Sequence, residues 1–336
     1  MSSVAASRGE AGDLSRFRRL TVATIAATFV LILIGGIVRV SDSGLGCGAA
    51  GSGTHGWPLC EGGVIPEGSS ESVIEFSHRI AATVVAVLIL AMVVFAWRRL
   101  RAHTWLVRGS IAAAVLVLAQ AALGGLTVEE GLHEYLVAAH LGLAMLLLGV
   151  LIALRRLAAA DTRPMAASRA LRTVTVVACT LVLGTIVAGG LVAGTEGEGK
   201  PSEPVLGAHT ACGEQFPTCL DRFLPFDEGR LVDIQLTHRV FMYLAAIAVL
   251  AMTALALRQG VRHPAFWIAS VLLLGQITLG ALNVWLGEHA GLIASHLVLG
   301  TVLWGTVVTA ATSMLPASAP AATDLGRARA ASPAAA

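Results

Sequence analysis

The chain has 336 residues, of which 56% are hydrophobic and only 13% are charged. A soluble domain carries roughly 25% charged residues, so this composition excludes a soluble globular protein and indicates one that is embedded in a membrane. The net charge of +2 indicates nothing by itself, and the expected partner is the lipid bilayer and not a nucleic acid.

A helix needs about 20 apolar residues to cross a bilayer. Eight segments approach or exceed this length, which predicts an all-α polytopic membrane protein with eight transmembrane helices. The predicted spans are 20–38, 76–97, 109–128, 135–154, 173–194, 234–257, 265–286 and 290–315. The first follows Arg16, Arg18 and Arg19 and has no small-residue cleavage pattern, so we interpret it as a retained signal anchor.

The basic residues set the orientation, because Lys and Arg gather in cytoplasmic loops. Most of the 23 Lys and Arg residues fall in the amino-terminal segment, the even-numbered loops and the tail. This predicts that both termini are cytoplasmic. The Ala/Pro/Ser-rich tail 316–336 is expected to be a disordered cytoplasmic segment.

The chain also repeats itself at an offset of roughly 154 to 160 residues. Gly35-Gly36 returns as Gly189-Gly190, the Pro-x-Cys of the first outer loop returns in the third, and a His-Arg pair heads both the second and the sixth span. We therefore predict two four-helix bundles, 20–157 and 173–315, flanked by a cytoplasmic segment 1–19 and joined by a cytoplasmic linker 158–172. An even number of spans per repeat makes the repeats parallel, with a pseudo-two-fold axis along the membrane normal.

Four histidines lie within about two helical turns of the outer end of spans two, four, six and eight: His78, His140, His238 and His296. Ligands in a four-helix bundle project inward from facing helices, so one pair in each bundle could hold a heme iron near the outer face. Gly124, Gly125 and Gly280 would leave room for a flat macrocycle. A lone histidine more often bonds to a neighbouring helix, but four at repeated positions favour ligation. Two ligands per bundle do not complete a zinc tetrahedron.

The two halves differ in one acid. Glu75 lies one turn before His78, whereas Gln235 takes its place before His238. This difference suggests a reactive first half and a fixed cofactor in the second. Glu75 could equally close a capping box with Ser72 at a helix start.

Three arginines and five cysteines complete the candidate residues. Arg39, whose counterpart is Ala193, adds a cation to the first half or snorkels at a helix end. Arg79 and Arg239 are candidate partners of heme propionates or markers of the membrane interface. Cys47, Cys60, Cys212 and Cys219 fall in outer loops, on the side where disulfides persist, and Cys179 is expected to be a packing residue.

With these motifs assembled, the chain resembles the heme A synthase family over nearly all of 20–315. The resemblance rests on the segments 35–47, 57–60, 75–79, 124–128 and 295–297. It implies an oxidoreductase that converts the C8 methyl of heme O, through hydroxylated intermediates, to the formyl group of heme A for terminal oxidases.

The resemblance also implies roles for individual residues. His238 and His296 would be the axial ligands of a resident heme b, and His78 and His140 those of the substrate heme O. Glu75 would be catalytic, and the cysteines would form disulfides Cys47–Cys60 and Cys212–Cys219. Twelve residues separate Cys47 from Cys60, against six between the later pair, and the family's first-loop spacing is nearer the shorter value.

Two other functions compete with this one. A non-enzymatic diheme b-type electron carrier explains the four histidines but not Glu75, and a transporter built from two parallel repeats predicts no heme at all. For the synthase, we expect heme O synthase as a candidate partner, an electron acceptor that the sequence does not identify, and a candidate homo-oligomer.

Overall fold

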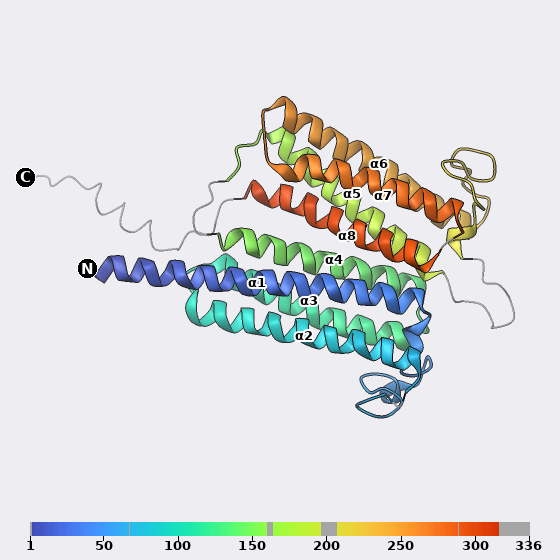
Figure 1. Ribbon diagram of the computed structural model, residues 1–336, viewed down its shortest axis with the longest axis horizontal. Coiled ribbons are helices and arrows are strands. Elements are labelled where there is room, and N and C mark those ends of the chain that lie inside the picture. Colours follow the sequence, from blue (N-terminus) through green and yellow to red (C-terminus); the bar gives the residue numbers. More distant parts are fainter. Residues whose placement is uncertain (1, 67, 160–163, 196–206, 288, 316–336) are drawn as a thin grey trace, which may run out of the picture.

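The computed structural model describes residues 2–66, 68–159, 164–195, 207–287 and 289–315. These residues form eight long helices joined by loops and three short 3-10 turns (Figure 1). All eight are long and apolar enough to cross a membrane, which confirms the predicted all-α polytopic class. They are α1 Ser2–Val40, α2 Ser70–Arg99, α3 Thr104–Glu129, α4 Glu134–Leu157, α5 Arg169–Gly194, α6 Arg230–Arg258, α7 Pro264–Trp285 and α8 Ala290–Ser313.

The first helix begins much earlier than the predicted span 20–38, because residues of the Arg-rich segment also have a core to pack against. Leu14 and Phe17 are buried in a cluster with Val85, Ile89 and Leu106 of α2 and α3. The predicted amino-terminal segment 1–19 is therefore largely a continuation of α1. The predicted tail 316–336 and part of the linker 158–172 lie outside the described residues.

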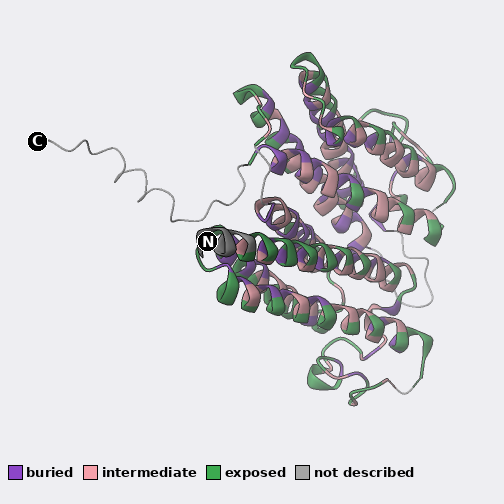
Figure 2. Ribbon diagram, turned by 60° about the vertical axis from the view of Figure 1, so that its left-hand side comes forward, coloured by how far each residue is buried: buried purple, intermediate pink, exposed green. Residues whose placement is uncertain are grey.

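Helices α1–α4 lie on one side of the molecule and α5–α8 on the other, and α4 and α8 pack together between them (Figure 1). Across this boundary the indole Nε1 of Trp304 in α8 donates a hydrogen bond to the carbonyl oxygen of Met145 in α4 at 2.7 Å. Figure 2 shows exposed residues along the outward faces of both groups of helices. The pseudo-two-fold relation of two repeats stays a prediction.

Local side-chain chemistry explains how polar residues are accommodated in these helices. Threonine hydroxyls donate to the carbonyl four residues earlier, as Thr21 does to Phe17 at 2.9 Å and Thr28 to Thr24 at 2.8 Å. Such bonds satisfy a hydroxyl where no water is present. Helix α2 is capped by Ser69, whose Oγ accepts from Ser72 N–H at 3.0 Å. The alternative capping box of Ser72 and Glu75 is wrong, because the helix begins at Ser70, ahead of both residues.

Candidate functional site

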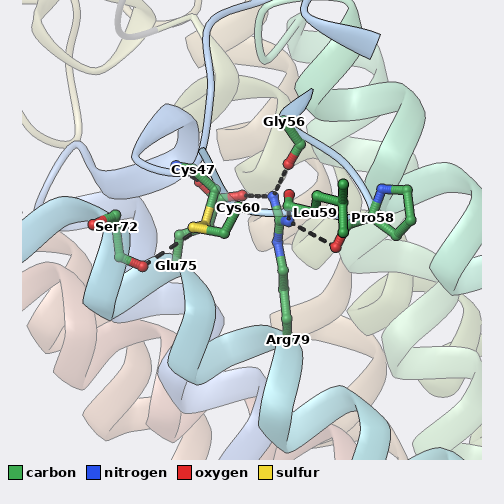
Figure 3. A network of polar contacts seen from close by, with 8 residues as sticks. All are labelled: Cys47, Gly56, Pro58, Leu59, Cys60, Ser72, Glu75 and Arg79. Atoms are coloured by element: carbon green, nitrogen blue, oxygen red, sulfur yellow. Dashed lines mark hydrogen bonds and ion pairs between the residues drawn. A yellow bond between two sulfur atoms is a disulfide. The ribbon is translucent and has the colours of Figure 1, made fainter. Parts of the chain in front are cut away.

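The buried acid of the first half lies under the first disulfide loop. Glu75 is on the second turn of α2 and is only 4% exposed. Its Oε2 accepts a hydrogen bond from the backbone N–H of Cys47 at 2.8 Å, and its Oε1 forms an ion pair with Arg79, four residues on. The carboxylate is therefore held on both oxygens, by a main-chain donor and by a cation (Figure 3).

Arg79 extends this contact into the loop. Its Nη1 donates to the carbonyl oxygen of Leu59 at 2.6 Å and its Nη2 to that of Gly56 at 2.8 Å (Figure 3). The same loop is closed by the disulfide Cys47–Cys60, which confirms the predicted pair despite its longer spacing. Loop, acid and cation thus form one polar network at this end of α2.

The second half has an arginine, Arg239, at the position equivalent to Arg79, but it has the neutral Gln235 in place of Glu75. Arg239 donates to the carbonyl oxygens of Thr218 at 2.7 Å and Gln215 at 2.9 Å, in a loop closed by the predicted disulfide Cys212–Cys219. Gln235 is buried, and its Oε1 has no hydrogen-bond partner among the described residues. Both arginines donate to loop carbonyls, and their pairing with heme propionates stays a prediction.

Each of the four histidines lies against a glycine of the preceding helix. A Cβ added at Gly35 in α1 would lie 3.2 Å from Nε2 of His78 in α2. The same close approach recurs in three more pairs, where an added Cβ would lie 3.0–3.1 Å from Cε1 of the imidazole. The pairs are Gly124 and His140, Gly189 and His238, and Gly280 and His296. Any side chain larger than hydrogen at these positions would press on the imidazole, so the glycines make room for the four rings.

These contacts correct the role that the sequence predicted for three glycines. We expected Gly124, Gly125 and Gly280 to leave room for a flat macrocycle. In the structure Gly124 and Gly280 accommodate imidazole rings, and Gly125 accommodates the indole of Trp57 from the first loop, 2.8 Å from an added Cβ.

The four histidines lie on α2, α4, α6 and α8, and their pairing around a shared iron stays a prediction. All four histidine residues are partly exposed. His238 Nδ1 lies 3.0 Å from the carbonyl oxygen of Thr185, which fits an axial ligand, because a backbone carbonyl on one ring nitrogen directs the other toward a metal.

The remaining imidazole nitrogens also suit a bound group. Nδ1 of His140 and of His296 is buried without a hydrogen-bond partner in the described part of the chain. Unpartnered buried nitrogens are costly, and they cluster where a ligand or ion completes the site. Two imidazoles per site, with no third donor implied, fit heme iron better than a tetrahedral ion.

Sequence reasoning missed the polar contacts that join the two halves near this end. The Arg39 guanidinium donates to the carbonyl oxygen of Ala193 in α5, with Nη2 at 2.6 Å and Nε at 3.0 Å. Glu134, at the start of α4, pairs with Arg230 at the start of α6. The only signal in the sequence was that Ala193 is the repeat counterpart of Arg39, which did not predict contact.

Comparison with known proteins points to one family. A family model described as cytochrome oxidase assembly protein matches residues 67–308. A protein of Shouchella clausii named heme A synthase is 34% identical over 148 residues, which is 44% of this chain and 47% of that protein. One of Alkalihalophilus pseudofirmus with the same name is 34% identical over 149 residues, covering 44% and 48%.

A longer alignment joins the chain to a third protein named heme A synthase, from Halalkalibacterium halodurans. It is 26% identical over 283 residues, which is 83% of this chain and 90% of that protein. In the two more identical alignments the chain spans about half the length of the curated relatives it matches.

Proposed function

Because this chain belongs to the cytochrome oxidase assembly protein family, we propose that it is a heme A synthase, an oxidoreductase that converts the C8 methyl of heme O to the formyl group of heme A. The observation that carries this proposal is the difference between two otherwise similar imidazole pairs. One has a buried carboxylate one turn away, in Glu75, and the other has the neutral Gln235.

The second half is proposed to hold a resident heme b between His238 and His296. Bound heme b supplies a one-electron redox centre. The contact of His238 Nδ1 with Thr185 supports this assignment, since it orients the ring and fixes its tautomer. Gly189 and Gly280 keep the two imidazoles free of clashes.

The first half is proposed to hold the substrate heme O between His78 and His140, with Glu75 as the catalytic proton acceptor. Oxidation of a methyl group through hydroxylated stages releases protons, and a positioned carboxylate can accept one or orient an attacking water. The Cys47 N–H and the Arg79 guanidinium contact this carboxylate and fix its direction. The disulfide loop covers it, which limits access of bulk water.

The proposal also covers the orientation of the protein in the membrane and its partners. Both termini would be cytoplasmic and both heme sites would lie toward the outer face of a bacterial plasma membrane, because most of the basic residues lie on the opposite side. Heme O synthase is the proposed donor of substrate, since direct transfer keeps a farnesylated heme out of water. A homo-oligomer and a membrane electron acceptor complete the set of proposed partners.

Identification of extracted hemes tests the function. The full-length protein is produced in a host that makes heme O but no heme A, and hemes are extracted with solvent and separated. A synthase yields hydroxylated or formylated farnesyl hemes in addition to protoheme. Protoheme alone would support the diheme electron carrier, and a purified protein without heme absorbance would support the transporter.

A further inference from the structure

Two consecutive glycines in α1 contact the two histidine sites at once. Gly35 faces the imidazole of His78, a proposed ligand of the first site. Gly36 faces Leu297 of α8, with 2.5 Å between an added Cβ and Leu297 Cδ2. Leu297 directly follows His296, a proposed ligand of the second site. Because consecutive helical residues point about 100° apart, one glycine pair can face two different helices.

The glycine pair in α5 makes the reciprocal contacts. Gly189 faces His238 of its own half, and Gly190 faces Ala138 and Leu141 of α4, with 3.1 Å from an added Cβ to Ala138 Cα and 3.2 Å to Leu141 Cδ2. Leu141 directly follows His140. In each pair the first glycine therefore contacts a histidine of its own half, and the second contacts the ligand-bearing helix of the other half.

The neighbouring turn fixes these contacts in place. Arg39, three residues after Gly36, donates to the carbonyl of Ala193, three residues after Gly190. One residue further on, a Cβ added at Gly194 would lie 2.6 Å from the Cα of Glu134, at the start of α4. The Arg39 side chain thus links α1 to α5, and both helices pack against the opposite half, α1 against α8 and α5 against α4.

We propose that Gly36 and Gly190 are positioning residues that couple the two heme sites, so that a change in packing at one site moves an axial ligand of the other. This inference rests on the proposed heme sites. Its physical basis is that close-packed helices transmit small displacements, because no free volume absorbs them. A methyl group at Gly36 would clash with Cδ2 of Leu297, so either the Leu297 side chain or α8 has to shift.

The test uses the full-length protein purified in detergent with its co-purified heme. In a His140→Ala background the first site lacks one ligand, so the bis-imidazole signal in low-spin ferric electron paramagnetic resonance comes from the second site. Adding Gly36→Ala, a change in the first half, is expected to shift the largest g value of that second-site signal. The additional change Leu297→Ala, which makes room for the new methyl group, is expected to restore it.

A matched control separates coupling from general damage. Gly291→Ala lies on α8 itself, where no atom of the described residues comes within 4 Å of the added Cβ, and it should leave the signal unchanged. If Gly36→Ala fails to fold, the reciprocal Gly190→Ala in a His296→Ala background, with hemin added to the first site, is expected to shift the first-site signal.

The outcomes distinguish this inference from the proposed function. A second-site signal that stays unchanged in Gly36→Ala, or a shift of equal size in Gly291→Ala, overturns the coupling while the heme sites stand. A wild-type protein that retains no heme overturns both the sites and the coupling.

Discussion

The backbone N–H of Cys47 donates to Oε2 of Glu75 at 2.8 Å, which connects the first disulfide loop to the buried acid of α2. The two residues are 28 positions apart, and one of them is itself cross-linked to Cys60. The proposed catalytic carboxylate is thus oriented by the loop as well as by its own helix.

Replacing Glu75 with Gln is expected to abolish heme A formation while heme binding persists. The amide can still accept the Cys47 N–H, so the loop stays in place, but it cannot accept a proton. Positioned acid-base groups contribute about 100-fold or more to rate, and the loss should be at least that large. Chromatography of extracted hemes measures it. The exposed Glu71→Gln, one turn earlier on α2, is the matched control, and undiminished product from Glu75→Gln would remove this residue from the mechanism.

Replacing Arg79 with Ala should destabilise the protein more than replacing Arg239 with Ala. Both variants lose hydrogen bonds to loop carbonyls, but only the first leaves a buried carboxylate without its cation. We expect a loss of about 4 kcal/mol for Arg79→Ala and about 2 kcal/mol for Arg239→Ala. Thermal unfolding in detergent compares the two.

The double variant Glu75→Gln/Arg79→Ala provides the control for that comparison. Removing the carboxylate charge should recover part of the stability lost in Arg79→Ala, because no unpaired charge then remains. No recovery would mean that the contacts of Arg79 with the loop, and not the ion pair, account for the loss.

The disulfide Cys47–Cys60 should contribute slightly more stability than Cys212–Cys219. The cysteines of the first are 13 positions apart and those of the second are 7 apart. The loop-entropy relation gives about 3 kcal/mol for the first and about 2.5 kcal/mol for the second. Thermal unfolding compares two double variants, Cys47→Ser/Cys60→Ser and Cys212→Ser/Cys219→Ser. A larger loss at the second pair would contradict the entropic account.

The contact of Glu134 with Arg230 should stabilise the packing of the two halves by about 1 kcal/mol, since one partner is buried and the other is half-exposed. The coupling energy comes from a double-mutant cycle of Glu134→Gln, Arg230→Gln and the double variant, measured by thermal unfolding. High salt should reduce it, because the arginine is open to solvent. A coupling energy of zero would show that the two side chains contribute independently.

The sequence did not show where two of the helices begin. The capping box of Ser72 and Glu75 fitted the local pattern, yet Ser69 caps α2, and the span 20–38 proved to be part of a helix that begins at Ser2. A pattern of a few residues does not reveal where a helix finds further packing partners. Leu14 and Phe17 extend α1 because α2 and α3 bury them.

The sequence by itself determined the eight spans and the outer loops that hold the four disulfide cysteines, because hydropathy and loop position are local properties of the chain. Only the tertiary structure decided that Glu75 bonds to Cys47, that a glycine faces each imidazole, and that Gly36 and Gly190 contact the opposite half. Every face of a membrane helix is apolar, so hydrophobicity does not choose its neighbours. The choice depends on which small residues let two particular helices approach, and that is settled only when all eight pack together.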